Sequence, residues 1–383
     1  MRWATIRKKL AKVDRALDKA MAASEIPGAV VLARMPREGE VLDHLSVRGH
    51  AVQRPERIAM SRETRFDLAS LTKVMVSATG ILLLADEGQL DLDDPVAKHL
   101  PQFGERDKEA VTIRHLLTHS SGLKPWRDFH EPLLEREQKK GERLMGTPAG
   151  HEWVCNAIYR SALVHEPGTA AVYGDLDFIV LGEVISALSH QPLEVFAEER
   201  IFEPLGLENT GYRSLPEEGA PPDPAARSIA ATENCPWRGR VLWGEVHDPN
   251  AWVMGGVAGH AGLFSTADDV MRFASAWLDA WHGRESPLPA ERVREFAERQ
   301  RLPEESDWAL GWDTPTAGSS SSGTHFSEKS IGHLGFTGTS VWIDLETEAI
   351  VVMLTNRIHQ VVKRSRFGLR PIVHDAIREA FVA

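Results

Sequence analysis

The stretch RFDLASLTKVM, residues 65–75, places Ser70 three residues before Lys73. A serine and a lysine at positions i and i+3 face each other only where the chain is helical. The residues that follow, VMVSATGILLLADEGQL (74–90), favour a long helix that closes at Gly88. A helix start offers free N–H groups and the positive end of the helix dipole, which both stabilise an oxyanion. Ser70 is therefore the candidate nucleophile.

A second serine and lysine with the same spacing, Ser121 and Lys124, provide a contrast within the chain. About one such pair is expected by chance in a sequence of this length, so spacing alone is a weak signal. Gly122 follows Ser121 directly, and Pro125 follows Lys124. Glycine weakens a helix, and the residue before a proline is pushed out of the helical region, so these two side chains are expected to point apart.

A lysine beside a serine needs help before it can take a proton. Its ordinary pKa is near 10.4, so Lys73 is charged at neutral pH unless its surroundings lower that value or a second group acts as base. A tyrosine beside cations can act in this way. One of the three tyrosines, Tyr173, stands between an extended stretch and a helix in PGTAAVYGDLDF (167–178), two residues before Asp175. Taken alone, such a tyrosine is more often a packing residue.

A third candidate stretch, IGHLGFTGTSVWID (331–344), leads into a C-terminal strand. Its residues His333 to Phe336 would lay an open strand edge along a substrate. The backbone N–H of Phe336, together with that of Ser70, would then form an oxyanion hole. A histidine taken alone is more often structural, so this role for His333 depends on the other two stretches.

Composition limits the classes of partner. The chain has 383 residues and a net charge of 44 minus 55, or −11, which argues against nucleic acid or an anionic membrane as partner. No apolar run approaches the roughly 18 residues of a membrane span, and the basic start of the sequence lacks the apolar core of a signal peptide, so a cytoplasmic protein is expected. Two cysteines, Cys155 and Cys235, exclude a disulfide framework. The oligomeric state is left open.

The order of predicted elements suggests how the chain is organised. An amphipathic helix covers about 6–21, strands are expected at 29–35 and 42–52, and a hairpin at 339–357 precedes a last helix at 371–382. Most signals in between are helical. Strands at both ends predict one sheet built from the two termini, with an inserted helical region. The predicted domains are 1–88 with 300–383, and 89–299.

Three motifs taken together resemble the serine β-lactamase and penicillin-binding-protein superfamily: S-x-x-K at 70–73, Y-x-D at 173–175 and H-x-G at 333–335. The chain is most similar to the class C β-lactamase-related serine hydrolases, which include family VIII esterases and D-stereospecific peptidases. Further matching stretches are FDLASLTKV, TIRHLLTHSSGL, EPGTAAVYGDLDF, IFEPLGLENTGY and GEVHDPNAWVMGGVAGHAGLFSTADDV. The similarity runs from about Pro27 to near the end. A class A enzyme is not favoured, since Ser-Asp-Asn and Lys-Thr-Gly are both absent.

The resemblance implies an α+β fold with an antiparallel sheet, flanking helices and an all-helical region, and an active site between them. No cofactor and no metal are expected. The resemblance also implies a role for each matching residue: Ser70 is acylated, Lys73 assists it, and Tyr173 serves as base and then as acid. Asp175 would orient Lys73 or the substrate. The substrate would lie along the strand edge at His333, Gly335 and Phe336.

Two departures from the family pattern bear on the substrate. Asp175 stands where many β-lactamases have asparagine, and His333 stands where they have the lysine of K-T-G. The site is then up to two charge units more negative, so β-lactams and peptides that carry a carboxylate should bind poorly. Neutral esters or amides should suffer less. Arg357, in LTNRIH, is a candidate to replace part of the lost charge.

Three functions are therefore compared. The leading one is a serine hydrolase of esters or small amides. The second is a D-Ala-D-Ala-type carboxypeptidase or a β-lactamase. The third is a non-catalytic binding protein on the same fold, which the joint presence of Ser70, Lys73 and Tyr173 disfavours.

His247, Asp248 and His260 are residues of metal-binding types and form a candidate metal site. The spacing of these residues fits no zinc pattern, so they are expected to shape a loop at the rim of the active site.

Overall fold

The structure is a computed structural model, and residues 3–37, 39–213, 215, 224–359 and 368–381 are described. Its main sheet has six described strands in the order β3-β2-β1-β11-β10-β9, and every neighbouring pair is antiparallel. The strands are β1 (Gly28–Arg37), β2 (Glu40–Val52), β3 (Ile58–Ala59), β9 (Ser330–Leu334), β10 (Ser340–Asp344) and β11 (Ala349–Thr355). Strands from the two ends of the chain meet at the centre, where Val30 of β1 pairs with Leu354 of β11. The prediction of one sheet built from both termini is confirmed.

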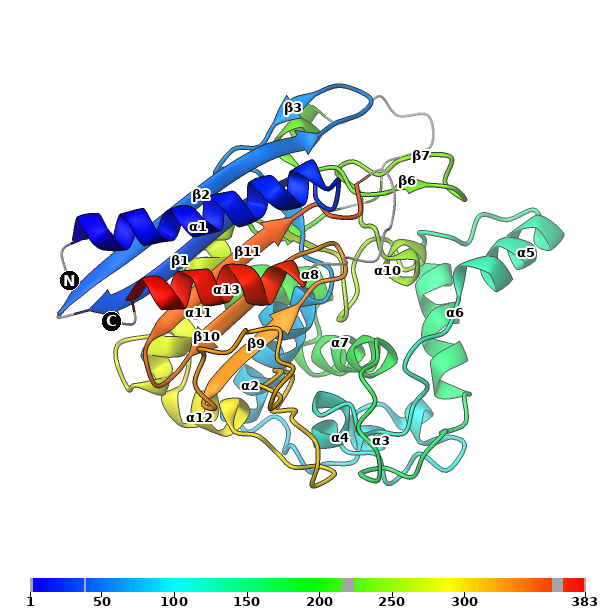
Figure 1. The fold of residues 1–383 in the computed structure, drawn as a ribbon. Helices are drawn as coiled ribbons and strands as arrows, with labels where there is room; N and C mark the ends of the chain where they lie inside the picture. The colour runs from blue at the N-terminus through cyan, green and yellow to red at the C-terminus, as the bar shows by residue number, and fades with distance from the viewer. Residues whose placement is uncertain (1–2, 38, 214, 216–223, 360–367, 382–383) are drawn as a thin grey trace.

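One face of this sheet is covered by the first and last helices, α1 (Trp3–Ala22) and α13 (Leu369–Phe381), which lie side by side in Figure 1. The apolar residues Ile6, Leu10, Val13 and Leu17 recur every three or four positions of α1 and are buried. Each such side chain contributes about 1.5–3 kcal/mol to stability when removed from water. The amphipathic pattern of the first helix therefore attaches it to the sheet.

The opposite face carries the larger core and the segment with Ser70. A π-helix at Lys73–Ala78 continues into α2 (Thr79–Asp86), and α11 (Ala267–Trp281) lies against β1, β10 and β11. The sequence predicted a continuous α-helix after Ser70, so the π-helical turns are a difference. Such turns are frequent at functional sites because they change the direction of side chains along a helix.

The rest of the chain is mainly helical, as predicted. The helices are α3 (Val96–His99), α4 (Ile113–Leu117), α5 (His130–Lys140), α6 (Pro148–Tyr159), α7 (Leu176–Ser189), α8 (Leu193–Ala197), α9 (Glu203–Leu205), α10 (Pro249–Val253) and α12 (Ala290–Ala297). Short 3₁₀ segments lie at Pro101–Gly104 and Pro224–Ser228, and a second π-helix lies at Glu198–Phe202.

Short strands also occur outside the main sheet, and the sequence did not predict them. They are β4 (Phe66–Asp67), β5 (Gly211–Tyr212), β6 (Asn234–Cys235), β7 (Arg240–Val241) and β8 (Leu263–Ser265). Strands of two or three residues are too short to show an alternating pattern. β4 pairs with β8 and so holds the segment before Ser70. Helix α11 belongs to the predicted helical domain, 89–299, but it packs on the main sheet. The predicted boundaries between the two domains therefore remain a prediction.

Two observations concern the chain as a whole. None of the described helices combines the length and the apolar character needed to cross a membrane. Cys155 and Cys235 are both buried and free, so the single disulfide that two cysteines allow is not formed.

Candidate active site

The turn before the helix fixes the position of Ser70. Ala69 adopts the left-handed conformation with φ of 47°, which costs about 1–3 kcal/mol for a residue other than glycine. Hydrogen bonds on both sides hold it there. The Ala69 N–H donates to Asp67 Oδ1 at 2.8 Å, and Thr72 Oγ1 donates to the Ala69 carbonyl at 2.7 Å. Ser70 is therefore presented by a rigid turn between β4 and the helix.

Lys73 connects the candidate catalytic residues. Its Nζ donates to Ser70 Oγ at 3.0 Å, to Tyr173 OH at 3.1 Å and to Asp175 Oδ1 at 2.7 Å. An ammonium group has three protons, so all of them are engaged. Burial alone would lower the pKa of Lys73, but the charge of Asp175, followed by the interactions with Tyr173, outweighs burial and raises it. Lys73 is thus a cation at neutral pH and holds no lone pair with which to accept the Ser70 proton.

The other serine–lysine pair is separated, as predicted. Ser121 is buried and donates a hydrogen bond to the buried carboxyl group of Asp177, while Lys124 is exposed. This arrangement leaves Ser70 and Lys73 as the pair that shares a hydrogen bond.

Aromatic rings surround Tyr173, a residue that is 42% exposed. Trp308 stacks on the Tyr173 ring, with ring centres 5.5 Å apart. The centre of the His119 ring lies 4.7 Å from that of Tyr173. Sequence reasoning missed both neighbours as parts of the site. The TIRHLLTHSSGL stretch, which contains His119, was the available signal, but Trp308 comes from a distant loop and gives none.

His119 acts on the backbone beside Tyr173. It is buried, and burial followed by the charge of Lys73 lowers its pKa to about 3, so the ring is neutral. Its Nδ1 accepts a hydrogen bond from the Gly174 N–H at 3.3 Å. A Cβ at Gly174 would lie 2.6 Å from Pro125 Cα, so only glycine fits between Tyr173 and Asp175.

The strand edge is neutral at His333. The residue is buried at the end of β9, and burial first, then the charge of Lys73, lowers its pKa well below its usual value. The Nδ1 lies 3.0 Å from the Leu334 carbonyl oxygen. The histidine at this position is therefore neutral, as the sequence argument assumed. The centre of its ring lies 5.9 Å from the centre of the Tyr173 ring.

The turn after β9 is attached to the segment before Ser70. Thr337 and Thr339 donate hydrogen bonds to the carbonyls of Asp67 and Leu68, at 2.7 and 3.0 Å. A Cβ at Gly335 would lie 2.5 Å from the Leu68 oxygen, so this close approach requires glycine. The turn is thus fixed beside the nucleophile.

The two backbone N–H groups expected to form the oxyanion hole belong to these attached segments. Within the described part of the chain, neither Ser70 nor Phe336 donates its N–H to another protein group. Phe336 as a residue is 51% exposed. Arg357 places its guanidinium carbon 5.3 Å from the centre of the Phe336 ring, so its charge lies beside this turn rather than at His333.

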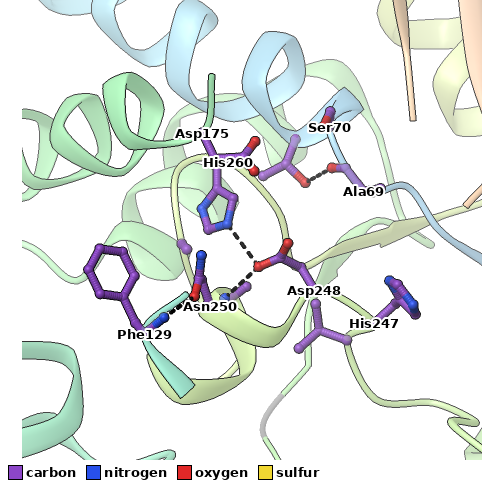
Figure 2. Close-up of polar contacts among 12 residues, drawn as sticks. Ala69, Ser70, Phe129, Asp175, His247, Asp248, Asn250 and His260 are labelled. Carbon is purple, nitrogen blue, oxygen red and sulfur yellow. Dashed lines mark hydrogen bonds and ion pairs between the residues drawn. The ribbon is translucent and has the colours of Figure 1, made fainter. Parts of the chain in front are cut away.

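Asp248 and His260 lie near Ser70 and Asp175, while His247 points away from them (Figure 2). Asp248 Oδ1 accepts from the Ala251 N–H at 2.8 Å and lies 2.9 Å from His260 Nε2. Burial would raise the pKa of Asp248, but His260 and these hydrogen bonds outweigh burial and lower it. His247 instead stacks on Phe336, with ring centres 5.5 Å apart, and lies 3.0 Å from Glu233.

The three residues of the candidate metal site are therefore not together: Asp248 and His260 contact each other, whereas His247 contacts other residues. Ligand-type atoms of Asp175, Asp248 and His260 lie within 4.8 Å of one another, and His247 is not among them. The placement of these loop residues beside the nucleophile agrees with the expectation that they shape the rim.

Comparison with known proteins identifies the family of the chain. Residues 13–369 match the family model described as Beta-lactamase. A relative from Escherichia coli K12, provisionally named a D-alanyl-D-alanine carboxypeptidase, is 33% identical over 328 residues, which cover 78% of this chain and 70% of the relative. A Salmonella agona protein with the same provisional name is 30% identical over 80% of this chain and 72% of its own length.

Solved structures share the fold. EstCE1, described as a hydrolase with promiscuous acyltransferase activity, has a TM-score of 0.72 at 22% identity, covering 97% of this chain and 99% of that one. A penicillin-binding-protein homologue from Caulobacter crescentus has a TM-score of 0.71 at 20% identity, covering 97% of each. The chain belongs to the β-lactamase family, and it is a serine hydrolase. The predicted fold class and family resemblance are confirmed.

Proposed function

We propose that the protein hydrolyses neutral esters or small amides through an acyl-enzyme on Ser70. The observation that carries this proposal is the Lys73 ammonium, which donates to both Ser70 Oγ and Tyr173 OH. Since Ser70 accepts a hydrogen bond from Lys73, its own proton is directed elsewhere. Tyr173, whose oxygen is bound by the same ammonium, is the base in this proposal.

The chemical steps follow from these positions. Ser70 Oγ attacks the substrate carbonyl carbon. At the same time the proton of the Ser70 hydroxyl passes to the phenolate oxygen of Tyr173. The N–H groups of Ser70 and Phe336 stabilise the developing oxyanion. Tyr173 then gives the proton to the departing alcohol or amine, which breaks the ester or amide bond. A water molecule attacks the acyl-enzyme with the same proton transfers and releases the acid.

The charges in the site favour a neutral substrate. His333 contributes no charge at neutral pH, and the charge of Lys73 is paired with that of Asp175. A substrate carboxylate at the strand edge would gain little from either residue and would be repelled by Asp175 and Asp248. An ester or amide without a carboxylate avoids this repulsion.

The second candidate is a carboxypeptidase that acts on peptides ending in D-Ala-D-Ala. Two observations favour it: the provisional names of the relatives from Escherichia coli and Salmonella, and the position of Arg357 beside Phe336. In this version of the site, Arg357 rather than His333 would meet the terminal carboxylate of the peptide.

One panel of substrates separates the two functions. The purified protein is assayed with a short-chain p-nitrophenyl ester, an acylated D-Ala-D-Ala peptide and a chromogenic cephalosporin, each with Ser70→Ala as control. Fast ester cleavage with little turnover of the other two supports the ester and amide function. Efficient release of D-alanine, or efficient opening of the cephalosporin, contradicts the charge argument and makes the second candidate the leading one.

We also propose a cytoplasmic location. The free, buried thiols of Cys155 and Cys235 are compatible with a reducing compartment. Fractionation of the native host with an antibody to the protein tests this, and recovery outside the cytoplasm would contradict it.

A further inference from the structure

A cavity of about 570 Å³ lies beside α6 and α7, away from the candidate active site. Its lining does not include Ser70, Lys73 or Tyr173. It is bounded by one face of α6, by α7, by the start of α8 and by the loop after α10. Three side chains of metal-ligating types meet in its wall. They are His151, Cys155 and Glu183, and their ligand-type atoms all lie within 4.8 Å of one another.

The two helices bring these groups together. His151 and Cys155 are four residues apart on α6, so they share one face of that helix. Glu183 faces them from α7, with Oε1 2.7 Å from His151 Nε2. Bonds of about 2.0–2.3 Å from a tetrahedral zinc ion to nitrogen, oxygen and sulfur place ligand atoms between about 3 and 4 Å apart. A small opening of the His151–Glu183 contact would reach that spacing.

The histidine is already oriented for this role. Nε2 of His151 lies 2.7 Å from Glu183 Oε1, and Met254 lines the same cavity. Metal-binding histidines commonly donate their second ring N–H to a carbonyl or carboxylate, which fixes the tautomer and the ring direction. The contact with Glu183 therefore already fixes the direction of the His151 ring.

The charge of the cavity favours a cation. Glu152 and Glu194 line it together with Glu183, and its described lining contains neither lysine nor arginine. His151 and Glu183 keep side-chain exposures of 33% and 24%, whereas Cys155 is buried, so an ion has a path to the thiol from the cavity. An accessible, negatively charged cavity with nitrogen, sulfur and oxygen donors suits a thiophilic divalent cation.

We propose that His151 Nε2, Cys155 Sγ and the Glu183 carboxylate bind a divalent cation of the zinc class, with water in the remaining coordination position. Binding breaks the Cys155 S–H bond, forms a sulfur–metal bond and releases the proton to solvent. Metal affinity should therefore increase with pH, because the metal competes with protons for its ligands.

The test uses the full chain after treatment with a chelator, titrated with Co²⁺ and then with Zn²⁺. We expect one equivalent of Co²⁺ to give a thiolate-to-cobalt charge-transfer band, which one equivalent of Zn²⁺ removes. Cys155→Ser should lose the band. Cys235→Ser, which changes the other buried thiol, should keep it. Glu183→Gln should weaken binding by at least about tenfold.

Two further readouts keep the outcome clear. Zn²⁺ should raise the Tm of the wild type and of Ser70→Ala, but not that of Cys155→Ser, whose folding is checked by circular dichroism. If Cys155→Ser does not fold, Glu183→Gln and His151→Gln provide the comparison. Absence of the charge-transfer band in the wild type, or an unchanged cobalt affinity in the variants, would overturn the proposal. Neither result depends on the activity of Ser70.

Discussion

Lys73 and Asp175 form an ion pair of 2.7 Å in which the lysine side chain is fully buried and the aspartate side chain is 20% exposed. The pair keeps Lys73 charged, because Asp175 is the main group that counters the effect of burial on its pKa. The same pair removes net positive charge from the neighbourhood of Ser70. We therefore expect a single residue, aspartate where many β-lactamases have asparagine, to affect both the proton-transfer chemistry and the choice of substrate.

Asp175→Asn should shift the enzyme toward substrates that carry a carboxylate. The change removes one negative charge close to Ser70, and about 1.4 kcal/mol of relieved repulsion corresponds to a tenfold preference. We expect kcat/KM for a carboxylate-bearing ester, divided by that for its neutral analogue, to rise at least about tenfold. The ratio corrects for any change in the common chemistry. An unchanged ratio would show that Asp175 does not set substrate charge.

Tyr173→Phe should lower kcat by at least about 100-fold, the usual scale of general acid–base catalysis. Its ring contacts with Trp308 and His119 are kept by phenylalanine, so the Tm should change little. Steady-state kinetics with the p-nitrophenyl ester and thermal unfolding measure the two effects. A nearly wild-type kcat would move the role of base to Lys73 alone.

His333→Lys should increase affinity for substrates with a carboxylate. Histidine at this position is neutral, so lysine would add a positive charge at the strand edge. The KM of a carboxylate-bearing ester is expected to fall, while that of its neutral analogue stays similar. An equal effect on both analogues would mean that the charge argument is wrong, or that Arg357 already supplies the needed charge.

Asp177 should make stability depend on pH. Burial, the largest cause, raises its pKa to about 8, against an ordinary value near 3.9 in the unfolded chain. Between these values the folded protein holds a proton that the unfolded chain has lost, so this contribution to stability is present at low pH and falls as the pH rises toward about 8. Asp177→Asn should remove that decline.

The measurement is the Tm of the wild type and of Asp177→Asn across this range of pH. We expect the wild-type value minus the variant value to decrease steadily as the pH rises. A difference that is constant with pH would show that Asp177 is ionised in the folded protein.

The sequence predicted those features that local patterns encode. The spacing of Ile6, Leu10 and Val13 gave the first helix, and the alternation around 339–357 gave the terminal hairpin. Ser70 could be distinguished from Ser121 because glycine and proline break the second pair locally. These predictions needed no knowledge of tertiary contacts.

Other features depend on long-range contacts that no local pattern encodes. The stacking of Trp308 on Tyr173 joins two segments that are far apart in the chain. The four-residue spacing of His151 and Cys155 was visible in the sequence, but Glu183 joins them only through the packing of α6 against α7. The π-helical turns at Lys73–Ala78, where a continuous α-helix was predicted, are a further difference.

The central claim is that Ser70 becomes acylated. The most direct measurement is the intact mass of the protein after brief mixing with an excess of the p-nitrophenyl ester and acid quenching, compared for the wild type, Ser70→Ala and Ser121→Ala. Ser121→Ala is the matched control, with folding checked by Tm because its hydroxyl bonds Asp177. We predict an added acyl mass and ester hydrolysis in the wild type and Ser121→Ala, and neither in Ser70→Ala. Full activity of Ser70→Ala, or an acyl group on it, would contradict the claim.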